Sequence, residues 1–267
     1  MAKRISVSRK MTKIFRKWEG ILFFILLAFV LEGISRVEIV SSLYFPPISK
    51  DISTFLNLTV SGILPLETLK TFTRMACGYV LAALIMIPLG IFMGISNKVY
   101  NVFEPIVELL RPLPPPAIIP AVMLFLGIGN SMKVFVIFFA CSFPIILNTI
   151  DGSRSVYPTF LHTARSFGLN RYQIIRRVIL PAATPQIMSG LRTSLPISLI
   201  VAILSEMIGS IDGIGHYILR MQRTFNIPEM YAGIMMLGLV GYFLNKIFLW
   251  IDKTLIAWHK GWRISGI

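Results

Sequence analysis

Long runs of apolar residues, separated by short polar segments, dominate this chain of 267 residues. A helix that crosses a bilayer needs about 20 mostly apolar residues, and backbone polar groups in lipid must be paired within the spanning structure. Each run therefore predicts a helix. We predict six transmembrane helices, at residues 20–40, 75–95, 102–126, 133–150, 186–208 and 231–251. The pattern thus predicts an all-α membrane protein with no large soluble domain.

The third run is interrupted at residues 111–116, whose sequence is RPLPPP. Proline lacks an amide donor and clashes with the preceding turn, so a regular helix cannot continue through this stretch. Either the helix breaks within the membrane, or residues 102–110 lie along the interface. Irregular backbone at membrane depth requires cover from protein or from a water-filled cavity.

The segment at residues 41–74 is the longest one predicted on the outer side. Pro46 and Pro47 precede a short helix at 48–58, and a second short helix at 64–73 leads into the second span. Both are expected on the outer surface. We divide the chain into a basic tail with the first span (residues 1–40), this outer segment (41–74), and a core (75–260) that contains an inner loop at 152–193.

Composition supports a membrane protein, because 55% of the residues are hydrophobic and only 14% are charged. A soluble domain normally carries about 25% charged residues. The net charge of +14 would also suit a nucleic-acid-binding protein. Here, however, the basic residues lie in short stretches between apolar runs, so we expect no nucleic-acid partner. Cys77 and Cys141 lie inside apolar runs and the three histidines are scattered, which predicts no metal site.

The basic residues also predict the orientation, because Lys and Arg concentrate on the cytoplasmic side. The first 20 residues carry Lys3, Arg4, Arg9, Lys10, Lys13, Arg16 and Lys17. Six spans then place both termini in the cytoplasm, and most of the remaining Lys and Arg fall in segments predicted inside. The four tryptophans lie at the predicted inner interface, which indoles prefer: Trp18, Trp250, Trp258 and Trp262. We expect a multi-pass protein of a bacterial inner membrane.

The inner loop at residues 152–193 predicts two short helices. The first, near 161–167, ends at Gly168, because glycine readily adopts the left-handed conformation that ends helices. The second covers residues 171–179 and ends at Leu180 and Pro181, and the next span begins near Pro185. Such a loop either projects from the membrane and binds a partner protein, or is an amphipathic connector that lies on the lipid headgroups.

A resemblance to a known family favours the first alternative. Residues 162–164 (HTA), Gly168 and residues 178–181 (VILP) resemble the EAA motif of ATP-binding-cassette importer permeases. That motif reads Glu-Ala-Ala, three residues, Gly, nine residues, Ile-x-Leu-Pro. The spacing matches in full, with His162, Thr163 and Val178 as departures. Residues 119–129, 143–149, 179–183 and 209–217 also look like the permeases of the sulfonate, taurine and nitrate importers, and the resemblance covers about residues 46–260.

The resemblance implies a type I importer permease fold that acts as a homodimer with two copies of a cytoplasmic ATPase subunit and an external solute-binding protein. The helix at 162–169 would couple ATP hydrolysis to transport. The residues that the resemblance places at this contact are Leu161, His162, Ala164, Arg165, Phe167, Gly168, Leu169, Leu180 and Pro181. The chain has no phosphate-binding Gly-x-x-x-x-Gly-Lys-Ser/Thr sequence. We therefore expect no cofactor and no enzymatic activity in this chain, with ATP and Mg²⁺ bound by the ATPase.

Ionisable residues inside spans are candidates for the translocation pathway. Glu206 lies in the fifth span and, with Ser194, Ser198 and Ser205, would form a polar stripe. Arg74 is a possible partner of Glu206 or a contact for an anion. Asn148 in the fourth span is a further candidate, although a packing role suits it equally well. The alternative for Glu206 is a structural hydrogen bond or ion pair to a neighbouring helix.

The transported solute is the least defined property. The resemblance implies a small oxoanion such as a sulfonate, taurine or nitrate, with bicarbonate or a heterocyclic thiamine-precursor-like solute as the alternative. A secondary transporter would show inverted internal repeats, and a membrane enzyme would show clustered His, Asp or Glu near one interface. Neither pattern is present in the sequence.

Overall fold

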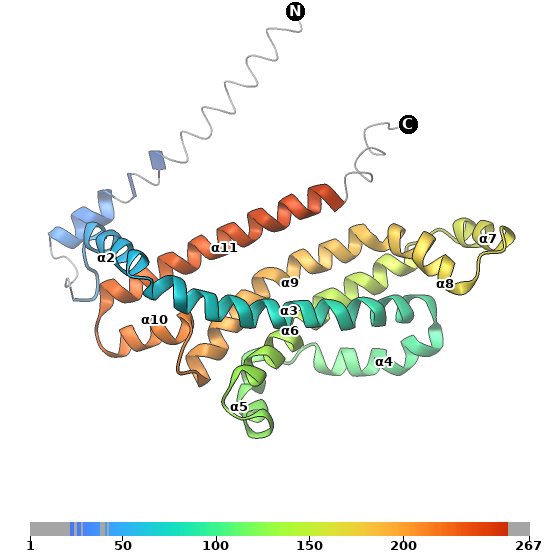
Figure 1. Cartoon of the computed structure of the whole chain (residues 1–267), viewed down its shortest axis with the longest axis horizontal. Helices are drawn as coiled ribbons and strands as arrows, with labels where there is room; N and C mark the ends of the chain where they lie inside the picture. The colour runs from blue at the N-terminus through green and yellow to red at the C-terminus, as the bar shows by residue number, and fades with distance from the viewer. Residues whose placement is uncertain (1–21, 24–25, 28, 38–40, 42, 256–267) are drawn as a thin grey trace, which may run out of the picture. The chain divides into compact units, whose positions relative to one another are not determined.

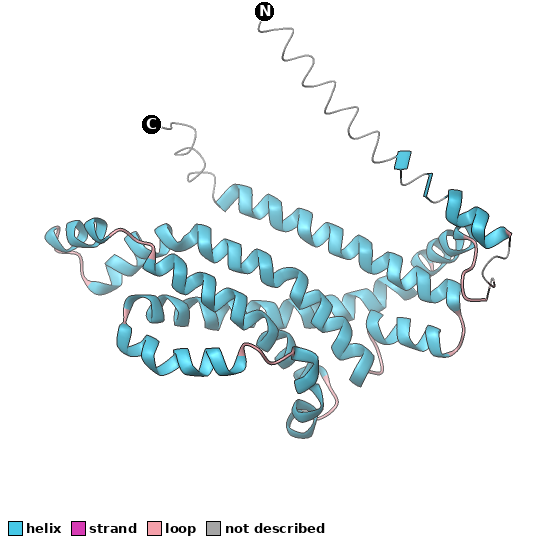
Figure 2. Ribbon diagram, turned by 180° about the vertical axis from the view of Figure 1, so that it is seen from behind, coloured by secondary structure: helices cyan, strands magenta, loops and turns pink. Residues whose placement is uncertain are grey.

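The computed structural model describes residues 22–23, 26–27, 29–37, 41 and 43–255, and all regular elements within these ranges are helices (Figures 1 and 2). Four helices in this part of the chain are long and apolar enough to cross a membrane: α3 (Ile63–Ile95), α6 (Asn130–Arg154), the helix Arg171–Gly209 that contains α9 (Leu180–Gly209), and α11 (Ile227–Leu255). The basic tail at residues 1–20 lies outside the described residues. Within the first predicted span, residues 22–23, 26–27 and 29–36 are helical, and the gaps between these ranges leave the full span a prediction.

The chain divides into two compact units, which are described separately. The smaller unit combines the described residues up to Ile63 with Ile218–Met235. It contains α2 (Ile48–Val60), which confirms the short helix expected after the two prolines. In this unit Glu32 accepts hydrogen bonds from the backbone N–H and the hydroxyl of Ser49, at 3.1 and 2.9 Å.

In the larger unit, α3 is one continuous helix of 33 residues. The separate surface helix predicted at residues 64–73 is therefore wrong. Pro65 lies in the first turn of α3, where proline is tolerated. Nothing from Leu66 to Met75 breaks a helix, and the polar residues Glu67, Thr71 and Arg74 recur at helical spacing on one face. These residues bind other parts of the chain instead of facing water, so polarity here marks a contact within the protein and not the end of the span.

The prolines divide the third predicted span into α4 (Asn97–Leu110) and α5 (Pro115–Leu126), which meet at an angle of 102°. Figure 1 shows α4 running back alongside α3 and α5 turning away from it. Val99 and Val107 of α4 pack with Met93 of α3 and Ile146 of α6. This packing favours a break within the membrane over a helix that lies along the interface.

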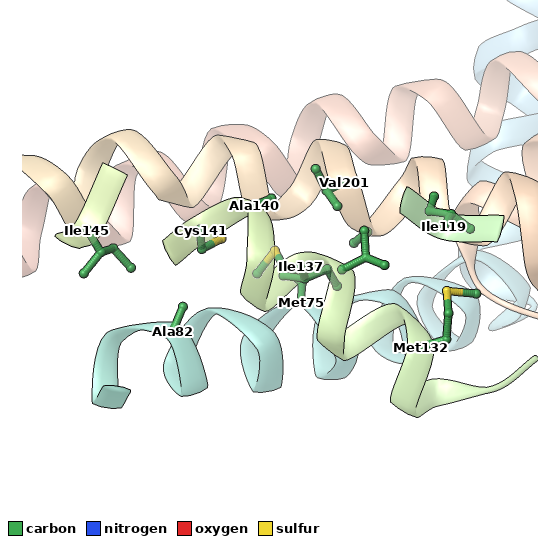
Figure 3. Packing of buried hydrophobic residues seen from close by; sticks show 11 residues of the cluster. Met75, Ala82, Ile119, Met132, Ile137, Ala140, Cys141, Ile145 and Val201 are labelled. Atoms are coloured by element: carbon green, nitrogen blue, oxygen red, sulfur yellow. The ribbon is translucent and has the colours of Figure 1, made fainter. Parts of the chain in front are cut away.

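The core of the larger unit forms where α3, α5, α6 and α9 meet. Figure 3 shows Met75 and Ala82 of α3, Ile119 of α5 and Val201 of α9 around buried residues of α6. Glycines allow these helices to approach closely. A Cβ on Gly90 would lie 2.7 Å from the Cβ of Thr149, and a Cβ on Gly94 would lie 2.5 Å from that of Ser153. Gly90 and Gly94 thus allow α3 to pack closely on α6. Small residues have this role at helix contacts of membrane proteins generally.

The contact between α6 and α9 is equally close. A Cβ on Gly190 would lie 2.8 Å from the carbonyl oxygen of Pro144 and 2.9 Å from the Cβ of Asn148. The side-chain amide of Asn148 donates to the carbonyl oxygen of Pro144 at 2.8 Å. These contacts anchor the N-terminal half of α9 against α6 and so position the loop that precedes it.

Candidate functional site

The inner loop begins with α7 (Pro158–Ser166), and Gly168 ends this helix in the left-handed conformation, with φ +72°. The amide of Leu169 donates to the carbonyl of Ala164 at 3.1 Å, and the amide of Gly168 donates to that of Arg165 at 2.9 Å. This pair of bonds is the Schellman arrangement that closes a helix C-terminus. The structure thus confirms the short helix and its glycine stop, which the spacing of the motif predicts.

The chain then restarts as a helix at Asn170. The side chain of Asn170 accepts from the amide of Gln173 at 2.9 Å, and the side chain of Gln173 accepts from the amide of Asn170 at 2.9 Å. This reciprocal capping box satisfies two amides at the helix start. It fixes the start of α8 (Arg171–Ile174) directly after the glycine turn.

The prediction that Leu180 and Pro181 end the second helix is wrong. Residues Ile175–Ile179 form a π-helical segment, and α9 follows without interruption. The amide of Leu180 donates to the carbonyl of Ile175, five residues earlier. A π turn is wider than an α turn, and Pro181 has no amide to leave unpaired, so the chain accommodates the proline. The helix therefore runs unbroken from Arg171 to Gly209.

The side chains of α7 point in two directions. Leu161 packs on the buried cluster of Ile91, Val156 and Ile179, and Ala164 is only 6% exposed. The resemblance implies that Leu161 is an anchor for a partner and that Ala164 permits its close approach. In this structure both side chains instead hold α7 against its own chain. Phe167 is 78% exposed, and His162 and Arg165 are also exposed.

Two further aromatic residues of the loop are exposed, and the motif did not point to them. Tyr157 and Phe160 pack edge to face, with ring centroids 6.0 Å apart, and both are largely accessible. They flank Pro158, the first residue of α7, and proline at the first helical position is a known sequence signal. The exposed rings of Tyr157, Phe160 and Phe167 and the exposed side chains of His162 and Arg165 are therefore available for a partner protein.

A second cluster of polar residues surrounds Arg74 in the N-terminal part of α3, which is the end predicted on the outer side. The guanidinium Nη1 of Arg74 donates to Glu206 Oε1 at 2.7 Å, Nη2 donates to Asp212 Oδ1, and Nε donates to Asn130 Oδ1 at 2.8 Å. One side chain of α3 thus binds the start of α6, the outer part of α9 and the loop after α9. We call the group the outer ion-pair cluster, and its charged members are Glu67, Lys70, Arg74, Lys133, Glu206 and Asp212.

Glu206 is fully buried and both of its oxygens are occupied. Besides the bond from Arg74, Oε2 accepts from the hydroxyl of Thr71 at 2.8 Å and from the amide of Gly215 at 3.0 Å. A buried carboxylate is stable only when it is paired and its remaining lone pairs are satisfied. In this structure Glu206 therefore binds protein groups only.

The loop between α9 and α10 (Ile214–Arg223) is held by the same cluster. The ammonium group of Lys133 donates to the hydroxyl of Ser210 at 2.6 Å, and Glu67 accepts from the amide of Gly213. Gly213 has φ +96°, and a Cβ there would lie 2.3 Å from the carboxylate of Glu206. Only glycine fits at this position.

Asp212 lies in this loop and is the partly exposed member of the cluster. Burial by itself raises the pKa of Asp212, but the hydrogen bond and charge of Arg74, together with the charge of Lys133, hold it below its ordinary value. Asp212 therefore stays ionised at neutral pH. The cluster contains three basic and three acidic side chains.

The other residues that the sequence assigned to the pathway face the protein interior. Ser194, Ser198 and Ser205 are fully buried, and each hydroxyl donates to a carbonyl of α9 itself. With Asn148 bound to Pro144 and Glu206 bound to Arg74, the geometry favours the structural alternative for this set. The sequence missed Asn130, Lys133 and Asp212 as members of the cluster, although each lies at the end of a predicted span.

Comparisons with known proteins agree with this architecture. Residues 86–258 match the family model described as the binding-protein-dependent transport system inner membrane component. The chain is similar to the taurine transport system permease protein of Escherichia coli, at 28% identity over 85% of this chain and 84% of that protein. It is also similar to the bicarbonate transport system permease protein of Synechococcus elongatus, at 27% identity over 89% and 87%.

The fold is similar to that of a chain in the methionine ABC transporter MetNI in an inward-facing conformation. The TM-score is 0.66 and the sequence identity is 17%, and the match covers 74% of this chain and 98% of that chain.

Proposed function

Because the chain belongs to the family of binding-protein-dependent transport system inner membrane components, and is the permease subunit of an ABC importer with the type I fold, we propose that α7 couples it to a separate ATPase. The observation that supports this is the construction of the inner loop. Its apolar side chains Leu161 and Ala164 fasten α7 to the subunit, whereas Phe160, Phe167 and Arg165 remain exposed.

We test the coupling role with Gly168→Trp and Phe167→Ala. No atom lies within 4 Å of the position of a Cβ on Gly168, so a tryptophan there projects from the loop, and its left-handed backbone is strained. Each variant is expected either to stop copurifying with the ATPase subunit or to stop stimulating ATP hydrolysis by that subunit. Gly62→Ala is the matched control, because Gly62 has φ +81° and open space around it but lies outside the loop. Normal assembly and transport by Gly168→Trp would show that α7 is not the coupling element.

The proposed complex contains a second copy of this chain, two cytoplasmic ATPase subunits and an external solute-binding protein. ATP and Mg²⁺ belong to the ATPase, because this sequence has no phosphate-binding loop of the Walker type. The basic residues of the first 20 positions support cytoplasmic termini. The mass of the detergent-solubilised complex, measured by light scattering with the micelle subtracted, tests the stoichiometry, and a single permease copy per complex would contradict it.

We propose that the cargo is a small oxoanion. The relatives named for taurine and bicarbonate transport share this chemistry, since taurine carries a sulfonate and bicarbonate a carboxylate-like group. A sulfonate, nitrate or bicarbonate is thus favoured over a heterocyclic thiamine-precursor-like solute. Uptake of labelled taurine, nitrate and bicarbonate by proteoliposomes that contain the full complex tests the class. Tight binding of a heterocycle by the external protein, with none of these anions transported, would contradict it.

The outer ion-pair cluster supports a different role for Arg74 and Glu206 in transport. We propose that the pair fixes the outer ends of α3, α6 and α9 and does not contact cargo. Every carboxylate oxygen of Glu206 is already bound, so a solute would have to displace a buried ion pair.

A further inference from the structure

The inner half of α9 presents polar side chains on the side of the helix that the subunit leaves uncovered. Gln186, Ser189 and Thr193 recur at the spacing of one helix face and are exposed, and exposed Arg192 lies beside them. The buried serines 194, 198 and 205 lie on a different side of the same helix. We call the exposed set, Gln186, Ser189, Arg192 and Thr193, the α9 polar stripe.

Contacts with neighbouring helices give the depth of the stripe. Glu206 of α9 is level with Thr71 and Arg74 of α3, because their side chains bond directly. Thr193 lies 13 residues further inward, which corresponds to about 20 Å along a helix. The hydrocarbon core of a bilayer is about 30 Å thick. Arg192, Thr193 and Ser189 therefore lie within the membrane, in its inner half. Gln186, 20 residues from Glu206 and so about 30 Å along the helix, lies at its inner boundary.

Polar side chains at this depth need polar surroundings. An arginine at the centre of a spanning helix is costly to insert, and such residues face a protein interior or a water-filled cavity. Arg192 makes no ion pair with any residue that the structure describes. The hydroxyl of Thr193 bonds to the carbonyl of Ser189 at 3.0 Å, which leaves its oxygen free to accept. Lipid alone would not satisfy this set.

Arg192 also lines a groove between α9 and the part of α11 after Met236. Figure 1 shows these two helices running alongside each other. The groove has a volume of about 300 Å³, at the small end of ligand pockets. Its polar side chains are Arg192 and Asn245, and the rest of its wall is apolar, including Leu195, Leu199 and Leu244. A cation and an amide beside an apolar wall suit a small anion that carries a short organic body.

We propose that the α9 polar stripe lines the water-filled inner half of the translocation pathway and that Arg192 is its contact for anionic cargo. The assignment of Arg192 rests on the proposed import of a small oxoanion, whereas the assignment of the stripe does not depend on the cargo.

Cysteine labelling tests the stripe. Ser189→Cys and Thr193→Cys are made in a Cys77→Ala chain, which keeps Cys141 because it is buried. Leu84→Cys in the same chain is the control. Leu84 is 68% exposed on α3, lies about 10 residues inward of Arg74, and lines a groove whose other side chains are almost all apolar. A charged, membrane-impermeant thiosulfonate is added to inside-out vesicles that contain the full complex. Because thiol reaction requires an ionised sulfur, both stripe cysteines should react at least about tenfold faster than the control.

Equal, slow labelling of Thr193→Cys and Leu84→Cys would overturn the pathway assignment and leave the importer function intact.

Arg192→Gln and Arg192→Lys then test the anion contact through uptake of labelled taurine and bicarbonate. Loss of a hydrogen bond to a charged group corresponds to a loss of affinity of about tenfold or more. Arg192→Gln should therefore reduce uptake of the anions by that factor, whereas Arg192→Lys should keep most of the uptake.

Unchanged uptake by Arg192→Gln, at equal amounts of protein in the membrane, would mean that Arg192 only extends to the headgroups, and would overturn its role. If the unmodified complex transports neither anion, the proposed cargo fails and the role of Arg192 fails with it. Labelling still decides the stripe in that case, so the two failures are distinguishable.

Discussion

The buried pair of Arg74 and Glu206 gives the sharpest quantitative prediction. Replacing Arg74 by methionine removes four hydrogen bonds and leaves the fully buried carboxylate of Glu206 with only Thr71 and Gly215 as partners. Removing one member of a buried ion pair costs about 3–5 kcal/mol, because the remaining charge is buried without compensation. Arg74→Met is expected to lower the free energy of unfolding by this amount, and Glu206→Met by less, because Arg74 then keeps its bonds to Asp212 and Asn130.

The double variant distinguishes a paired charge from a general loss of packing. Methionine at both positions leaves no unpaired charge between the helices, so its cost should fall below the sum of the single costs by about 2–3 kcal/mol. The control pair is Glu108 and Arg111, which lie 3.3 Å apart but are 55% and 53% exposed, and is expected to contribute at most about 1 kcal/mol. Unfolding by sodium dodecyl sulfate, followed by circular dichroism, measures all variants. Additive costs for Arg74 and Glu206 would refute the reasoning.

Three further predictions concern single positions. Gly213→Ala should destabilise the loop after α9 by more than about 1 kcal/mol, since its Cβ would lie 2.3 Å from Glu206 and its φ is +96°; hydrogen exchange of that loop checks this. Burial raises the pKa of Asp51 to about 6, so its contribution to stability is present below about pH 4 and is lost as the pH rises through 6; Asp51→Asn should remove this pH dependence of unfolding. Asn170→Ala should loosen the start of α8 by about 1 kcal/mol through the lost capping box, while Gln173→Ala should cost less, as limited proteolysis can show.

The long helices could be predicted from the sequence because their signal is local. An apolar run of about 20 residues indicates a span whatever the rest of the chain does, and α3, α6, α9 and α11 all follow such runs. The glycine stop at Gly168 is local in the same way. The proline at 181 misled the prediction because the π-helical segment before it depends on backbone hydrogen bonds that the residue types do not specify. The helix α10 was missed because its ten residues form no apolar run.

The candidate sites could be predicted only in part, because their contacts join distant positions. Arg74 bonds to residues 132 and 138 positions later in the chain, and these pairings depend on how the helices pack. The sequence singled out Glu206 and Arg74 correctly as unusual within spans, and it left open whether they pair. It placed the polar stripe of α9 on the serines 194, 198 and 205, whereas the exposed polar side chains are offset from these by a few residues. Which face of a helix is exposed depends on its neighbours, and sequence periodicity alone cannot distinguish a buried polar face from an exposed one.

The continuous helix from Arg171 to Gly209 connects the inner loop with the outer ion-pair cluster. Its 39 residues correspond to about 58 Å, enough to cross the membrane and extend beyond it on the inner side. Close packing of Gly190 on α6 and the bonds of Glu206 to α3 hold it at two levels. A displacement of α7 must therefore either bend this helix, for which Pro185 and Pro196 are the weak points, or strain the bonds of Glu206. The α9 polar stripe lies between these two prolines, so bending there would reorient the stripe while the outer cluster stays closed.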